Sequence, residues 1–314
     1  MLLVIDPADD INTKAIISMM AFTDVNLSQL LRIHLDGIPL ELTAKLLPRR
    51  ARLKLSLVIH LVLHARAQKI KATEHQQPTG IVSRSSLEAI IDSLERSIRK
   101  LQPRADETEW GNYYQGNTTY SSAAADAKAK QVATLLKPLK IHSVVDFGGN
   151  DGTYSRPLHK LGISTVCTDI DPTAVESNYR RVRQHKEELM LPLLVDLTNP
   201  GGALGWQNSE RQPLHERLQA DAVMALALIH HLAISNNLPL ANIADYFAKF
   251  APYLVLEFVP KDDSQVQKLL ATRKDIFPDY HEAGLKTAFS GQYKLLSETK
   301  IKGTKRTLYL FKRK

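Results

Sequence analysis

The second half of the chain alternates strand-like apolar runs with segments of helix length. The strand-like runs cover residues 143–147, 165–169, 192–196, 222–228 and 253–258. Each link between them is long enough for the crossover helix that parallel strands require. The alternation therefore predicts an α/β fold in which a parallel sheet is covered by helices on both faces.

The last part of the chain breaks this alternation. Residues 293–297 and 306–311 form two further strand-like runs, which are separated only by a short polar link. A link of this kind joins antiparallel strands. We therefore predict a mostly parallel, seven-stranded sheet with a C-terminal antiparallel hairpin at its edge.

The first hundred residues show helical spacing of apolar residues instead. Breaks at Pro48 and at the polar residues 73–80 divide this region into several helices. The last of them begins with a predicted capping box of Ser85 and Glu88. We expect an all-helical N-terminal region, a linker and a ligand-binding α/β domain, covering residues 1–104, 105–122 and 123–314.

Composition and charge narrow the class of protein. Of the 314 residues, 44% are hydrophobic and 24% are charged, which is typical of soluble globular chains. The only cysteine, Cys167, can form neither an internal disulfide nor, alone, a zinc site, so we predict a reducing compartment and no metal centre.

No segment predicts export or membrane insertion. The N-terminus lacks the features of a signal peptide, and the longest apolar run is too short for a membrane span, so we expect a cytoplasmic protein. The net charge of +8 would suit a polyanion, but the chain has no dense Lys/Arg block. Nucleic acid is therefore kept as an alternative partner and is not favoured.

A glycine-rich turn follows the first predicted strand. Its residues are Gly148, Gly149, Asn150 and Gly152, and Asp146 precedes it. Because glycine has no Cβ, such a turn lets a ligand approach the backbone closely. The glycine spacing differs from the dinucleotide fingerprint, which argues against NAD. A nucleoside-type ligand is indicated, with a purely structural tight turn as the alternative.

This turn resembles the Asp-x-Gly-x-Gly-x-Gly loop of class I S-adenosylmethionine-dependent methyltransferases. Asn150 stands where that pattern has its middle glycine, and asparagine tolerates the left-handed conformation better than most residues. The resemblance implies a Rossmann-like methyltransferase fold with S-adenosylmethionine as cofactor. It also implies that Asp146 orients the methionine end of the cofactor and that the glycine turn packs against it.

Acidic residues also end the next two predicted strands. Asp169, followed by Ile170, lies about twenty residues beyond the turn, where an acid can accept hydrogen bonds from ribose hydroxyls. Asp171 is predicted to cap the following helix. Asp196 and Leu197 stand where the resembling enzymes hold adenine, although Asp196 could instead form a turn. Three acids at one end of a parallel sheet predict one binding site.

His230 and His231 follow the fourth predicted strand, a position that abuts the transferable methyl group in similar methyltransferases. A histidine there could be the base for an alcohol or phenol acceptor. The alternative is that one or both only pack the pocket. Glu257 and Lys261, at the end of the fifth strand, are predicted to contact the acceptor, with a solvated turn as the alternative for Lys261.

Two further residues are assigned to the site from less regular segments. Tyr114 belongs to an aromatic cluster in the linker, which is either a lid over the cofactor or interdomain packing. Trp206 lies in the long polar stretch 198–213, and long loops at a sheet's carboxyl end are often functional. We therefore assign Trp206 to the acceptor site.

Strings at residues 226–237, 257–262 and 306–310 narrow the resemblance to a bacterial group related to a rhizobial host-specific nodulation protein. The favoured hypothesis is a methyltransferase that acts on a small molecule, sugar or lipid by in-line displacement, which needs no covalent nucleophile. Two alternatives stay open: an RNA or ribosomal-protein methyltransferase, and a non-catalytic cofactor-binding scaffold.

Overall fold

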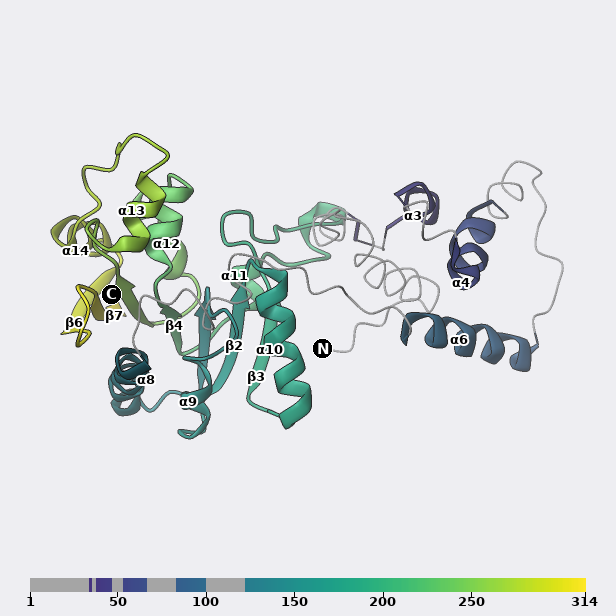
Figure 1. The fold of residues 1–314 in the computed structure, drawn as a ribbon, viewed down its shortest axis with the longest axis horizontal. Coiled ribbons are helices and arrows are strands. Elements are labelled where there is room, and N and C mark those ends of the chain that lie inside the picture. The colour runs from purple at the N-terminus through teal and green to yellow at the C-terminus, as the bar shows by residue number, and fades with distance from the viewer. Residues whose placement is uncertain (1–33, 36–37, 47–52, 67–82, 100–121) are drawn as a thin grey trace. The chain divides into compact units, whose positions relative to one another are not determined.

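The chain divides into two compact units in the computed structural model, which describes residues 34–35, 38–46, 53–66, 83–99 and 122–314. One unit comprises Met1–Ala105 with Leu204–Gln207, and the other comprises Asp106–Ala203 with Asn208–Lys314 (Figure 1). The predicted linker, residues 105–122, lies almost wholly outside the described residues. Its assignment therefore stays a prediction.

The described part of the first unit is helical. Its helices are α3 (Leu40–Leu46), α4 (Leu55–Leu57), which continues into η3 (Val58–Leu63), and α6 (Arg84–Arg99). Leu57, Leu61 and Leu94 are buried. His60 Nε2 lies 3.0 Å from Ser93 Oγ, at hydrogen-bond distance. This polar contact thus connects η3 with α6.

Helix α6 begins two residues earlier than predicted, after Ser83 instead of Ser85. The Ser86 amide donates a hydrogen bond to Ser83 Oγ at 3.2 Å, while Glu88 accepts one from Arg84 Nε at 2.8 Å. The predicted capping box of Ser85 and Glu88 is therefore wrong. Ser83 has the same hydroxyl group as Ser85, and its Oγ accepts the hydrogen bond from the Ser86 amide in the first turn.

The second unit is built on one 7-stranded sheet in the order β3-β2-β1-β4-β5-β7-β6. The strands are β1 (Ser143–Phe147), β2 (Ser164–Asp169), β3 (Met190–Leu194), β4 (Ala222–Ala225), β5 (Tyr253–Phe258), β6 (Tyr293–Lys300) and β7 (Thr307–Arg313). Strands β1 to β5 pair in parallel, and β7 is antiparallel to both β5 and β6. The predicted Rossmann-like methyltransferase fold is confirmed.

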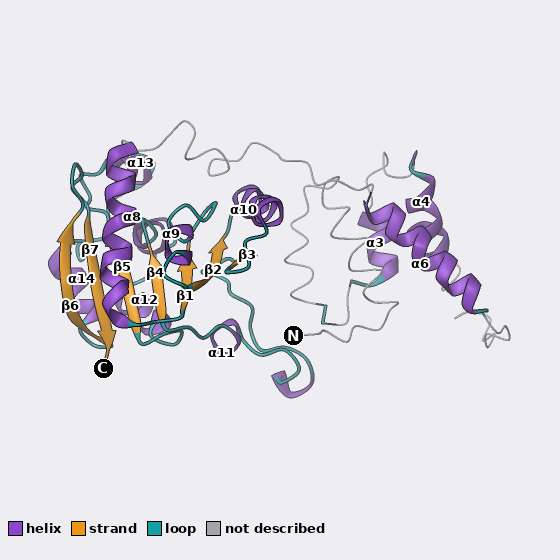
Figure 2. Cartoon of the chain, turned by 90° about the horizontal axis from the view of Figure 1, so that it is seen from below, coloured by secondary structure: helices purple, strands orange, loops and turns teal. Residues whose placement is uncertain are grey.

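Helices cover both faces of the sheet. They are α8 (Ser122–Leu136), η4 (Lys137–Leu139), α9 (Arg156–His159), α10 (Pro172–His185), η5 (Trp206–Asn208), α11 (Leu214–Arg217), η6 (His231–Ser235), α12 (Leu240–Phe247), α13 (Ser264–Leu270) and α14 (Glu282–Phe289). Helices α8 and α9 lie on one face and α12 and α14 on the other (Figures 1 and 2). Among the described helices, none has the length and apolar character needed to cross a bilayer.

Strand β4 shows why both faces are apolar. Val223 and Ala225 are buried in the cluster that includes α12 and α14, while Ala222 and Met224 are buried in the cluster that includes α8 and α9. Successive strand residues point to opposite faces, so a strand covered on both sides is a continuous apolar run.

Of the seven strands, β1 and β5 have the predicted bounds, β2, β6 and β7 extend beyond the predicted residues at one end, and β3 and β4 end earlier than predicted. Strand β4 ends at Ala225 instead of residue 228, and Ala227 has a φ of 50°, which is incompatible with a strand. Strand β3 ends at Leu194 instead of residue 196. Beyond it, Asp196 Oδ1 accepts a hydrogen bond from the Thr198 amide at 2.9 Å, which turns the chain.

The register of the sheet aligns the strand ends that matter for the site. Phe147 at the end of β1 is paired with Thr168 on β2 and with Ala225 on β4. The three parallel strands therefore end level with one another. The residues that follow them gather at one edge of the sheet, where ligands bind in open α/β folds.

Candidate active site

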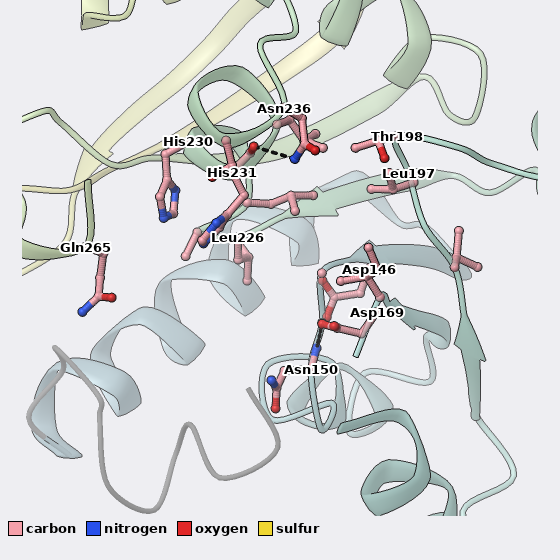
Figure 3. A pocket seen from close by; sticks show the side chains of 18 of the residues that line it. Asp146, Asn150, Asp169, Leu197, Thr198, Leu226, His230, His231, Asn236 and Gln265 are labelled. Atoms are coloured by element: carbon pink, nitrogen blue, oxygen red, sulfur yellow. Dashed lines mark hydrogen bonds between the residues drawn. The ribbon is translucent and has the colours of Figure 1, made fainter. Parts of the chain in front are cut away.

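A pocket of about 240 Å³ lies at this edge. The predicted site residues that line it are Asp146, Gly148, Gly149, Asn150, Asp169, Ile170, Asp196, Leu197, His230 and His231. They come from the ends of four parallel strands that are far apart in the sequence. The structure thus brings most of the predicted cofactor residues to one cavity (Figure 3).

Gly149 allows the turn to pass close to the sheet. A Cβ atom on this residue would lie 2.5 Å from Cys167 Sγ and 2.7 Å from Asp146 Oδ2, which is closer than real contacts allow. Asn150 has a φ of 51°, in the left-handed region that asparagine tolerates. Its amide donates a hydrogen bond to Asp169 Oδ2 at 2.9 Å. The departure from the family pattern at Asn150 is therefore accommodated.

Gly152 packs behind the turn and does not line the pocket. Its φ is 78°, and a Cβ atom there would lie 2.8 Å from Arg156 Nη1 and 2.9 Å from Asn178 Nδ2. Arg156 in turn donates to Asn178 Oδ1 at 2.6 Å and pairs with Glu187 at 2.9 Å. The glycine makes room for this arginine, so its assignment as a cofactor contact has no support from the pocket geometry.

Asp146 presents a buried carboxylate oxygen without a partner. The side chain is buried, and its Oδ2 accepts a hydrogen bond from Ser155 Oγ at 2.5 Å. Its Oδ1 has no hydrogen-bond partner among the described residues. Burial raises the pKa of this carboxyl to about 7, against the opposing attraction of Lys128. A cationic ligand group beside Oδ1 would supply the missing partner and favour the ionised form.

Asp169 and Asp196 both combine a backbone role with a place in the pocket lining. Asp169 accepts the Asn150 amide on Oδ2 and the Asp171 amide on Oδ1, each at 2.9 Å. Carboxylate oxygens have two acceptor sites each, so Asp169 can still accept hydrogen bonds from ribose hydroxyls. Asp196 forms the turn with Thr198, so the turn-forming alternative is confirmed while the residue also lines the pocket.

The predicted role of Asp171 as a helix cap is confirmed. Its Oδ1 accepts hydrogen bonds from the Thr173 amide at 2.8 Å and the Ala174 amide at 3.3 Å, at the start of α10. The cap also fixes the Asp171 amide that donates to Asp169. The loop after β2 is therefore held in place by the helix that follows it.

His230 and His231 lie side by side, with ring centroids 4.1 Å apart. Figure 3 shows both rings across the pocket from Asp146 and Asp169. Burial lowers the pKa of His230 well below its ordinary value and that of His231 to about 4, and the positive charge of Arg306 adds to both shifts. Both imidazoles are therefore neutral at physiological pH and are weak bases.

A buried cluster of charges beside the histidines was not predicted. Lys128 Nζ lies 2.5 Å from Glu257 Oε2, and Arg306 Nη1 lies 3.3 Å from Glu257 Oε1. Arg306 Nε also pairs with Asp263 Oδ2 at 2.8 Å. Lys128 and Arg306 line the pocket. They come from α8 and from the residue before β7, and no motif in either segment marks them as neighbours.

The predicted acceptor residues are not part of the pocket lining. Glu257 is fully buried and is engaged by the two cations that do line it. Lys261 pairs with Asp275 at 2.7 Å and donates to the Phe277 carbonyl at 2.7 Å. Both residues stand at the carboxyl end of β5 as expected, but these partners hold their charged groups elsewhere.

Of the remaining two predicted residues, Trp206 does not line the pocket and Tyr114 is not among the described residues. Trp206 is 76% exposed and belongs to the segment Leu204–Gln207, which groups with the first unit. Their roles at the acceptor and as part of a lid therefore stay predictions.

Comparison with known proteins gives a curated relative. No family model matches the chain. The chain is 33% identical over 288 residues to the nodulation protein NoeA of Rhizobium meliloti (strain 1021). The chain is therefore similar to this nodulation protein. The alignment covers 90% of this chain and 60% of NoeA, so the chain spans well under the full length of that relative. The predicted resemblance to a nodulation-related group is confirmed.

Solved structures similar to this chain include two methyltransferases. The N-methyltransferase NodS from Bradyrhizobium japonicum WM9 has a TM-score of 0.45 at 12% identity, covering 62% of this chain and 98% of NodS. The magnesium protoporphyrin IX methyltransferase ChlM from Synechocystis PCC 6803, crystallised with bound SAM, has a TM-score of 0.47 at 13% identity, covering 76% and 100%. These likenesses concern the fold alone.

Proposed function

We propose that this chain is an S-adenosylmethionine-dependent methyltransferase that acts on a small molecule, sugar or lipid. The observation that carries the proposal is the convergence of Asp146, Asp169 and Asp196 with the glycine turn on one pocket. The methyltransferase fold and the similarity to NoeA support it. The choice of acceptor class follows from the nodulation relationship and not from the pocket.

The residues present fit the proposed cofactor. Asp146 Oδ1 would accept from the methionine ammonium, and Asp169 would accept from the ribose hydroxyls. Leu197 and the 58% exposed Ile170 supply apolar surface for the adenine, next to Asp196. When bound, S-adenosylmethionine supplies an activated methyl group on its sulfonium sulfur. The task left to the protein is to orient the acceptor and to exclude water.

Calorimetric titration of the full chain with S-adenosylmethionine, S-adenosylhomocysteine and NAD tests this proposal. We expect micromolar binding of the first two ligands and none of NAD. Asp169→Ala should abolish the binding. Asp245→Ala is the matched control, because this exposed acid on α12 bonds only to Gln292 in the described structure and does not line the pocket. Absence of binding by either adenosyl ligand would contradict the proposal.

A further inference from the structure

The two halves of the pocket differ in charge. The carboxylates that line it are Asp146 and Asp169, at the carboxyl ends of β1 and β2, and Asp196, just beyond β3. The other half is lined by His230, His231 and Gln265, with Arg306 and Lys128 close enough for their charges to act on His230, while Lys128 also attracts Asp146. Among the described residues that line this second half, none carries a carboxylate. Figure 3 shows His230, His231 and Gln265 on the side away from Asp146 and Asp169.

The cations of the second half are fixed in position. The side chains of Lys128 and Arg306 are only 2% and 1% exposed, and both are held by Glu257. Lys128 Nζ also lies 4.0 Å from the centre of the Tyr154 ring. Glu257 itself does not line the pocket. The wall of this half is therefore formed by the positive members of the ion pairs, in surroundings where charges interact strongly.

The same half holds no effective base among the described residues. His230 is buried, and its Nδ1 has no hydrogen-bond partner there. Burial keeps the pKa of His230 well below its ordinary value and brings that of His231 to about 4. Such a histidine does not deprotonate a phenol, whose pKa is about 10, or an alcohol. The acceptor atom must therefore carry an available lone pair at neutral pH without help from these rings.

Neutral amines and carboxylates both meet this condition, but the positive charges of Lys128 and Arg306 favour one of these acceptors over the other. An amine nitrogen becomes positive as its bond to the methyl carbon forms, and this charge would develop beside Lys128 and Arg306, which repel it. A carboxylate is attracted to the same cations when it binds. The arrangement therefore favours the anionic acceptor.

We propose that the acceptor is a carboxylic acid, bound as its carboxylate beside Lys128 and Arg306 with His230 as a hydrogen-bond donor, and that the product is its methyl ester. This inference rests on the proposed function. In the balanced step, a carboxylate oxygen forms the bond to the methyl carbon as the sulfur–methyl bond breaks. The electron pair of that bond stays on sulfur, which gives S-adenosylhomocysteine, and no proton is taken up or released. The histidines thus orient the acceptor and do not act as bases.

The test uses the full chain saturated with S-adenosylhomocysteine and three probes of similar size: benzoate, benzamide and benzylamine. We expect benzoate to bind at least about tenfold more tightly than either of the others. We also expect benzoate to shift the ring resonances of His230 and His231, a readout that needs no variant. In Lys128→Met the preference for benzoate should fall, whereas Lys130→Met, an exposed lysine on the same helix, should keep it.

The outcomes separate the two proposals. If benzamide or benzylamine binds as tightly as benzoate, or if none of the three binds to a protein that does bind S-adenosylhomocysteine, the carboxylate inference is overturned and the proposed function stands. If S-adenosylhomocysteine itself does not bind, the proposed function fails first.

Discussion

When no ligand is present, ionisation of the buried Asp146 carboxyl lowers the stability of the protein. This carboxyl is buried, and burial raises its pKa to about 7, so the folded state holds the proton more tightly than the unfolded chain does. The contribution of this group to stability is therefore fully present below the ordinary carboxyl pKa and is lost as the pH rises through about 7. A ligand cation beside Asp146 would supply the partner that the ionised carboxylate lacks and so stabilise that form.

Asp146→Asn should remove this pH dependence. The amide has the same shape, and its oxygen can still accept the hydrogen bond from Ser155. We expect the free energy of unfolding at pH 8 to exceed that of the wild type by up to about 4 kcal/mol. At pH 5 the difference in the free energy of unfolding between the variant and the wild type should be less than half of its value at pH 8. Urea unfolding at the two pH values measures both, and equal stability at pH 8 would contradict the account of Asp146.

Gly149 should be far less tolerant of a side chain than Gly202 of the same domain. Its added Cβ would overlap Cys167 and Asp146, so Gly149→Ala should lower the free energy of unfolding by about 1–3 kcal/mol and weaken ligand binding. Gly202→Ala is the control, because nothing lies within 4 Å of its added Cβ. Urea unfolding measures the free energy of unfolding of the two variants. Similar losses in both would contradict the close contact of the Gly149 backbone with Cys167 and Asp146.

At the scale of elements, the buried charges connect α8, β5 and β7. Lys128 lies on α8, Glu257 on β5, and Arg306 directly before β7, and all three side chains are almost completely buried. Desolvation of these charges opposes folding, and their mutual attraction compensates only while each keeps its partner. The cluster therefore makes the position of α8 against the sheet depend on Glu257.

Glu257→Gln should be strongly destabilising. It leaves Lys128 without its close carboxylate partner and weakens the hold on Arg306, and loss of one member of a buried pair costs about 3–5 kcal/mol. Asp262→Asn breaks an ion pair with Lys305 at the surface, where the Lys305 side chain is 64% exposed and that of Asp262 is 62% exposed. Loss of this exposed pair should lower the stability far less. Thermal unfolding of both variants checks this, and a small shift for Glu257→Gln would mean that the cluster does not support the fold.

Individual elements show what could be predicted from the sequence. The bounds of β1 and β5 match the prediction because each is an apolar run between polar residues. Strand β4 is shorter because the backbone at Ala227 leaves the extended region, and a run of apolar letters does not reveal that. The pairing of Lys128 with Glu257 depends on how α8 packs against the sheet, so no local pattern contains it.

At the scale of the whole molecule, the cofactor half of the site was predictable, whereas only His230 and His231 of the acceptor half were predicted. Parallel strands end level, so Asp146 and Asp169 meet at one edge of the sheet, and Asp196 follows β3 at the same edge. Lys261 shares the same edge, but its ion pair with Asp275 depends on a distant loop. The rest of the acceptor half is formed by side chains from elements that no sequence pattern identifies as neighbours. Arg306 was missed for this reason.

Hydrogen–deuterium exchange of the full chain, with and without S-adenosylhomocysteine, tests the central claim most directly. If one pocket holds this ligand, exchange should slow together in three separate segments, residues 146–152, 169–171 and 194–198, while α12, which does not line the pocket, should be unchanged. The Asn150 and Asp171 amides, which donate to Asp169, lie in the first two segments. Binding without slower exchange in these segments would contradict the site.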